Sequence, residues 1–78
     1  MKKLVYKATV GKNVGKIHEP HLFNDGFYVV SRTRFAKDYV NVKTLNEVYE
    51  CYKKGFNIRM SHKGEKPSLI SPKSVQEI

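Results

Sequence analysis

The chain has almost no cysteine, the residue that forms disulfide bonds. Of its 78 residues, one is a cysteine and none is a tryptophan. A single cysteine excludes an internal disulfide, and cysteine-poor chains are typical of reducing compartments. We therefore expect a cytoplasmic protein whose stability comes from an ordinary hydrophobic core.

Long hydrophobic runs are also absent. The longest contain three or four residues, whereas a membrane-spanning helix needs about 18. The basic start at Met1–Lys3 resembles that of a signal peptide, but Lys7 interrupts the apolar stretch that such a peptide needs. We expect neither a membrane partner nor secretion by this route.

Acidic residues are scarce. Seven Asp and Glu oppose 15 Lys and Arg, which gives a formal net charge of +8. The excess lies in residues 1–37, which hold eight basic and two acidic residues, against seven and five in residues 38–78. A basic surface favours polyanions, because its contacts with phosphates release condensed counterions.

What is present is enough for one core. Hydrophobic residues make up 40% of the chain and aromatic residues 12%, which is typical of a folded protein rather than a disordered tail. We expect residues 1–78 to form a single compact domain with a stability of about 4 to 12 kcal/mol. Because so small a core buries little apolar surface, formation of a homodimer would add stability by burying more.

Alternation and β-branched or aromatic residues predict three strands in the first half of the chain. In residues 2–10, Leu4 and Tyr6 lie on the face expected to be buried. Residues 27–35 and 39–42 are predicted to form the next two strands. Between the first and second of these strands, residues 17–26 are predicted to be a loop. Pro20 lacks an amide donor, and an Asn-Asp-Gly turn follows it. Within 27–35, the predicted core face contains Phe27, Val29 and Phe35.

The helix is the best-specified element. Thr44 and Glu47 have the spacing of a capping box, in which each side chain accepts a hydrogen bond from the other residue's amide. The apolar stripe that follows has helical spacing and consists of Leu45, Val48, Tyr49 and Tyr52. Gly55 is suited to the left-handed conformation that ends a helix. The sequence predicts a helix over residues 45–54.

Alternation in residues 56–62 predicts a fourth strand, and residues 68–71 a short fifth one. Residues 71–78 are expected either to open a last helical turn at Ser71-Pro72 or to fray. The predicted fold class is therefore α+β: a small antiparallel sheet of four to five strands packed against one α-helix, in the order β-β-β-α-β(-β).

The glycine-rich segment 11–16 follows a strand, as a nucleotide-binding P-loop does. It has three residues between its glycines instead of four, and Ile17 follows Lys16 where a Ser or Thr is needed for magnesium. We interpret the segment as a basic turn whose Lys12 and Lys16 are able to touch a phosphate backbone.

Three histidines and Cys51 are the candidate metal ligands. His18 and His21 flank a proline that prevents helical ligand spacing, and together with His62 they match no zinc template. We expect no metal and no cofactor, and interpret the histidines as loop residues near the basic surface. On a binding face, their protonation in mild acid would strengthen polyanion binding.

Catalytic residues are not predicted. Cys51 falls near the C-terminal end of the helix, where the helix dipole disfavours a thiolate, so we interpret it as a packing residue. The serines lack a nucleophile-elbow context and an evident base. We expect a non-enzymatic protein.

The strongest candidate site is a basic sheet face. Aromatic side chains of a sheet can stack on bases while lysine and arginine hold phosphates. The candidate nucleic-acid-binding residues, taken from the first two strands and the glycine turn, are Lys3, Lys7, Lys12, Lys16, Tyr28, Arg32 and Arg34. The alternative is a sheet face that is simply solvated, which is common in antiparallel sheets.

Three strands followed by a helix, joined through Val42–Glu47, resemble the layout of the small DNA-binding domains of the integrase and plant AP2 type. The chain lacks their tryptophan and glycine signatures, and its predicted strand 56–62 departs from their layout. In size and lack of motifs it is similar to orphan proteins carried by phages, plasmids and other mobile elements.

Two functions follow as hypotheses. In the first, a small basic protein binds DNA or RNA through its sheet face. In the second, it is a protein-interaction or adaptor module whose basic face docks an acidic partner, with the sheet edge and the helix residues Tyr49 and Tyr52 contributing. The type of nucleic acid, the oligomeric state and the roles of His18, His21 and Cys51 stay open.

Overall fold

A computed structural model describes residues 3–34 and 38–78. In chain order the described residues form β1 (Leu4–Lys7), β2 (Ile17–Pro20), β3 (Tyr28–Ser31), β4 (Tyr39–Val42), α1 (Leu45–Lys53), β5 (Asn57–Ser61), β6 (Ser68–Ile70) and β7 (Gln76–Glu77). All the strand pairings are antiparallel. The predicted α+β class, with an antiparallel sheet and one helix, is confirmed.

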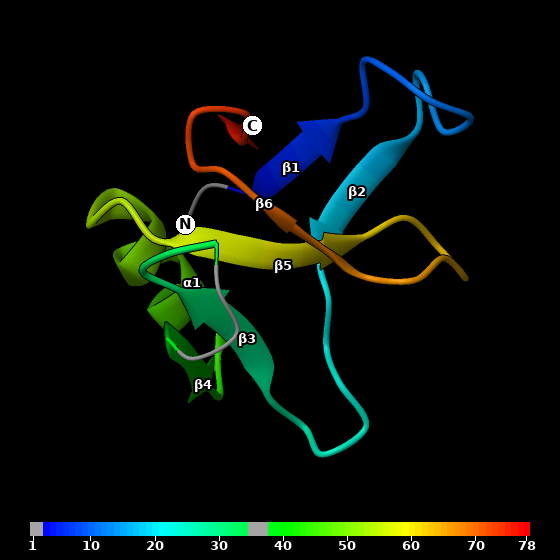
Figure 1. The fold of residues 1–78 in the computed structure, drawn as a ribbon. Coiled ribbons are helices and arrows are strands. Elements are labelled where there is room, and N and C mark those ends of the chain that lie inside the picture. Colours follow the sequence, from blue (N-terminus) through cyan, green and yellow to red (C-terminus); the bar gives the residue numbers. More distant parts are fainter. Residues whose placement is uncertain (1–2, 35–37) are drawn as a thin grey trace.

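Strand β5 lies at the centre of the sheet (Figure 1). Ile58 faces both Val30 of β3 and Ile70 of β6, so β3 and β6 lie on opposite edges of β5. Met60 likewise faces both β2 and β6. Strands β3 and β2 therefore follow one another along the same edge of β5, β3 at its start and β2 at its end.

The strand pairings lead from the centre of the sheet to the C-terminal strand. From β5 they pass through β2 and β1 to β7, and β7 is joined to β6 by residues 71–75. Beyond the strand pairs, Lys3 and Ile78 exchange two backbone hydrogen bonds of 2.8 Å, each donating its N–H to the other's carbonyl. The two ends of the described chain are thus held side by side.

Helix α1 begins where the sequence predicts and ends close to the predicted position. Thr44 Oγ1 accepts a hydrogen bond from the amide of Glu47 at 3.2 Å, and Glu47 Oε2 accepts one from the amide of Thr44 at 3.3 Å, which completes the capping box. Gly55, with φ of +92°, adopts the left-handed conformation after the last turn. The helix ends at Lys53, one residue earlier than predicted.

The core lies between the helix and the sheet. It is centred on side chains from β1, β3, α1, β5 and the segment before β7, namely Leu4, Val30, Val48, Ile58, Met60 and Val75. The alternation predicted in β5 is confirmed, because Ile58 and Met60 are completely buried. In β3 the predicted face is wrong: Val30 is completely buried while Val29 is only half-buried. The reason is that α1 covers the side of the sheet that Val30 faces; Phe35 lies outside the described residues.

Two strands were missed by the sequence prediction. Residues 17–20, expected to be a loop, form β2, whose backbone pairs with both β1 and β5. The missing amide of Pro20 does not interrupt the pairing with β5, since the next amide, that of His21, donates to the Arg59 carbonyl at 3.0 Å. Residues 76–77 form β7 beside β1, after a turn rather than a helix at residues 71–75.

The predicted order β-β-β-α-β(-β) is therefore wrong. The structure has four strands before the helix and three after it within the described residues. The layout of three strands followed by a helix, on which the likeness to integrase and AP2 domains rested, is not the one that forms. Two long-range pairings, β2 with β5 and β1 with β7, account for the difference.

Truncation of the central strand tests this description of the core. Ile58→Ala should lower the free energy of unfolding by about 2 to 5 kcal/mol, because it removes completely buried carbon atoms from a packed site. The same change at Ile78, whose residue is 69% exposed, should alter it by less than about 0.5 kcal/mol. Urea denaturation followed by circular dichroism measures both. Equal losses for the two variants would contradict the assignment of the core.

Candidate nucleic-acid interface

The structure divides the predicted binding residues between the two ends of β5. Arg32 and Arg34 follow β3, which lies beside the start of β5. The loop that carries Lys12 and Lys16 precedes β2, which lies beside the end of β5. In Figure 1 the loops after β3 and between β1 and β2 leave the sheet on different sides. These residues do not form one continuous face.

Arg32 and Arg34 are both exposed, and Arg32 contacts an aromatic ring. The Arg32 guanidinium carbon lies 5.6 Å from the centre of the Phe56 ring, within reach of a cation–π interaction. Arg34 is exposed and borders residues 35–37, which lie outside the described part of the chain. Arg32 thus already has an aromatic partner within the protein.

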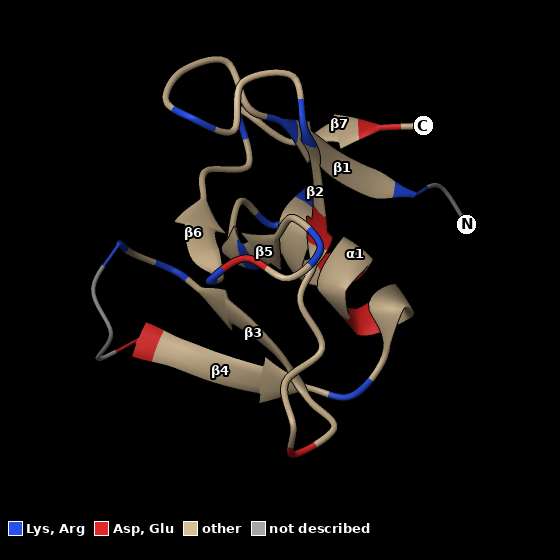
Figure 2. Cartoon of the chain, turned by 90° about the vertical axis from the view of Figure 1, so that its right-hand side faces the viewer, with Lys and Arg blue, Asp and Glu red and all other residues tan. Residues whose placement is uncertain are grey.

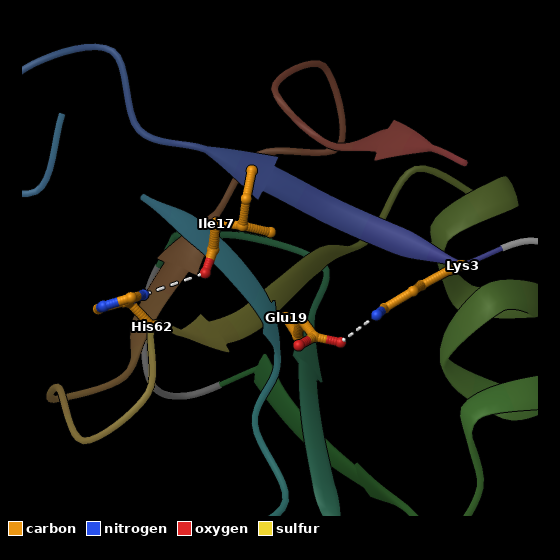
Figure 3. A network of polar contacts seen from close by, with 4 residues as sticks. All are labelled: Lys3, Ile17, Glu19 and His62. Carbon is orange, nitrogen blue, oxygen red and sulfur yellow. Dashed lines mark hydrogen bonds and ion pairs between the residues drawn. The ribbon is translucent and has the colours of Figure 1, made fainter. Parts of the chain in front are cut away.

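Lys3 and Tyr28 line a different feature. They border a hollow of about 370 Å³ whose apolar wall includes Leu4 and Val48 of the core. Lys3 Nζ lies 2.9 Å from Glu19 Oε1, so an acidic neighbour compensates its charge (Figure 3). The ring of Tyr28 is half-buried and packs against the core. Neither side chain adds to an open basic surface.

The other end of β5 is strongly basic. We call residues 7–17 and 62–67 the basic end; they contain five exposed lysines and one acidic residue, Glu65. The lysines are Lys7, Lys12, Lys16, Lys63 and Lys66. Both loops project on the same side of the molecule in Figure 1, and Figure 2, which views that side, shows blue segments in each. None of the five forms an ion pair with any residue that the structure describes.

A histidine ties the two loops together. His62 Nδ1 donates a hydrogen bond of 3.2 Å to the carbonyl oxygen of Ile17, as Figure 3 shows. Within the first loop, the amide of Ala8 donates to Lys16 and the amide of Gly15 donates back to Ala8, at 3.1 and 2.9 Å. The lysines therefore extend from backbone that is held in place.

Lys63 and Lys66 were missed by the sequence prediction. They are about 50 residues from Lys12 and Lys16, and only the pairing of β2 with β5 brings their loop to the same end. The missing signal was that pairing, since recognition of β2 as a strand would have placed both loops together.

The histidines do not all lie in loops. His18 is buried, with its ring centre 5.3 Å from that of Tyr6 and 5.9 Å from that of His62. Its Nδ1 is buried without a hydrogen-bond partner among the described residues. His21 Nδ1 is 2.8 Å from Ser61 Oγ. Within residues 3–34 and 38–78 no group of three His, Cys, Asp or Glu side chains is arranged to hold a metal ion.

Two further groups on α1 have perturbed acidity. Burial raises the pKa of the Cys51 thiol; Lys54 acts in the opposite direction, while Glu47 and Glu50 add to the increase. The hydroxyl of Tyr49 donates a hydrogen bond of 2.9 Å to Glu77 Oε1, and this bond is the main cause that raises its pKa. Both residues pack against the core.

Tyr52 also packs against the core, with its ring centre 6.1 Å from that of Tyr49. The two tyrosines thus contribute to the protein's own packing, and Tyr49 additionally joins the helix to β7. Their packing agrees with the predicted apolar stripe of the helix, to which both tyrosines belong.

Comparison with known proteins adds no family. No protein-family model matches the chain, and no curated protein or solved structure is significantly similar to it. Among the described helical residues there is no segment long and apolar enough to cross a membrane.

The thiol of Cys51 provides a test of the packing of α1. Because its pKa is raised, less of it is thiolate at neutral pH. The rate of its reaction with a disulfide reagent should be several-fold lower in the folded protein than in the chain unfolded in urea. In the folded protein this rate should also increase at higher pH values than in the unfolded chain. Absorbance of the released thiol measures both rates. Equal rates in the two states would contradict the half-buried position.

Proposed function

We propose that this protein binds nucleic acid through its basic end, without catalysing a reaction. One observation carries the proposal: five exposed lysines without ion-pair partners lie on two loops that the sheet brings to the same end of the molecule. Compared with the sequence hypothesis, Lys7, Lys12 and Lys16 are kept, Lys63 and Lys66 are added, and Arg32 and Arg34 are left at the other end of β5.

The electrostatics favour a phosphate backbone. Lysines without an ion-pair partner keep their charge available, and each one that meets a phosphate releases condensed counterions. The contrast with Lys3 and Lys53 supports this choice, since these two lie 2.9 and 3.4 Å from Glu19 and Glu50. The lysines of the basic end therefore keep a charge that an external anion can neutralise, and five of them lie on two loops at one end of the molecule.

A protein partner is the second candidate, and a different observation favours it. Val10 and Val14, in the same loop as Lys12, are 77% and 58% exposed. An acidic protein would bury these valines and neutralise the lysines at the same time, as an adaptor module requires. Affinity capture that enriches one acidic protein, equally with and without nuclease treatment, would favour this candidate over nucleic acid.

Salt dependence tests the nucleic-acid proposal. If all five lysines meet phosphates of duplex DNA, the slope of log affinity against log salt should be about −4.5, from about −0.9 per contact. Changing both Lys12 and Lys16 to alanine should make the slope about 2 units shallower. Fluorescence anisotropy with a labelled duplex, between about 50 and 200 mM salt, measures these slopes.

The matched control changes Lys53 and Lys54 to alanine at the end of α1. It removes the same formal charge away from the basic end, so the slope should stay close to that of the unchanged protein. If both double variants lost affinity equally, binding would depend on net charge alone and the proposed interface would be wrong. Absence of binding to duplex DNA, single-stranded DNA and RNA at low salt would end the proposal.

A further inference from the structure

A hollow opens within the basic end, between β2 and the end of β5. Its volume is about 420 Å³, and its lining includes Ile17, His21, Leu22, His62 and Lys63. Unlike the hollow beside Lys3, it is bordered by a lysine of the basic end and by two imidazole rings. Its walls therefore combine flat, partly polar rings with apolar side chains.

Both imidazole rings are held in place. His62 Nδ1 donates to the Ile17 carbonyl at 3.2 Å, so in the neutral ring the proton is on Nδ1 and Nε2 carries a lone pair. Figure 3 shows this second nitrogen pointing away from Ile17. His21 is fixed by Ser61 at 2.8 Å and by the edge-on ring of Phe23, whose centre is 4.5 Å away. The rings need little reordering to bind a flat ligand.

The apolar part of the wall is open to a ligand. Leu22 is 55% exposed and Ile17 is 45% exposed. Exposed apolar side chains beside fixed imidazoles suit an aromatic heterocycle, which gains from apolar contact on its faces and from hydrogen bonds at its edge.

The positive charge beside the hollow suits a ligand that carries phosphates. Lys63 lines the hollow, and Lys16 directly precedes Ile17 in the chain. The one carboxylate in the lining belongs to Glu19, and Lys3 compensates it at 2.9 Å. A nucleotide within a nucleic-acid strand fits these charges, because its neutral base is linked to negatively charged phosphates.

We infer that the hollow receives an unpaired base, so that the protein prefers single-stranded nucleic acid to duplex. The inference rests on the proposed function and narrows it. In a duplex the faces of the bases are stacked on one another, whereas in a single strand a base can turn out and lie against His62. The lysines of the basic end hold the neighbouring phosphates while the base stacks on the face of the His62 ring.

The experiment compares labelled ligands of equal length, about 12 nucleotides, which is within the range of such sites. They are oligo(dT), oligo(U), an abasic strand with the same phosphates, and a duplex. Fluorescence anisotropy at fixed salt should show oligo(dT) or oligo(U) binding about tenfold more tightly than the abasic strand.

Two variants of His62 locate the effect. His62→Ala should reduce the preference for bases over the abasic strand to about twofold or less, and its duplex affinity should match that of His62→Phe, since both changes remove the hydrogen bond to Ile17. His62→Phe should keep most of the preference, because it retains a ring face. As a control, Lys12→Ala should weaken binding to all ligands by the same factor, since it removes a phosphate contact and no base contact. Circular dichroism establishes that each variant is folded.

The outcomes separate the two proposals. If the protein binds duplex and abasic strands as tightly as oligo(dT) and oligo(U), the base site is wrong and the electrostatic function stands. If His62→Phe loses the preference as fully as His62→Ala while folded, stacking on residue 62 is wrong. If no ligand binds at low salt, the proposed function itself fails.

Discussion

The structure depends on strand β5, which forms backbone hydrogen bonds with three other strands. β5 pairs with β6 along one edge and with β3 and then β2 along the other, and its residues Ile58 and Met60 are completely buried beneath α1 and the sheet. Five residues thereby connect the part of the sheet built by β3 and β4 with the part built by β1, β2 and β7. Burial of these two side chains also accounts for much of the hydrophobic stabilisation that so small a core can provide.

This arrangement also decides where the charge goes. β3 and β2 pair with different ends of β5. The arginines that follow β3 and the lysines that precede β2, which all belong to the basic first half of the sequence, are therefore separated in space. The same pairing gathers lysines that are about 50 residues apart. Like charges held on one small end repel one another, a cost that the sheet must offset and that a bound polyanion would relieve. The basic end is thus a local property of the fold as well as a bias of the composition.

Local patterns in the sequence predicted the elements that depend on neighbours in the chain. Thr44, Glu47 and Gly55 define the helix through contacts within a few residues, and alternation in residues 57–61 is clear because both buried residues are large and apolar. β2 was not predictable in this way, since Ile17-His18-Glu19-Pro20 has no apolar alternation and its buried residue is a histidine. Nor was the buried side of β3, because either Val29 or Val30 satisfies a period of two. For the candidate site, Lys12 and Lys16 were visible as a basic turn, whereas Lys63 and His62 became part of it only through the long-range pairing.

The mutual hydrogen bonds of Lys3 and Ile78 affect the order in which the protein folds. β1 closes its outer edge with residues from the far end of the described chain, so this contact spans almost the whole sequence. Contacts of such separation form late, because the entropy of closing the long loop must first be offset by other structure. On the ribosome, β1 and β2 would emerge early and β1 would wait with one edge unpaired until residues 76–78 had been made. A strand exposed in this way can pair with another chain, so the late contact with residues 76–78 also covers an edge at which two chains could associate.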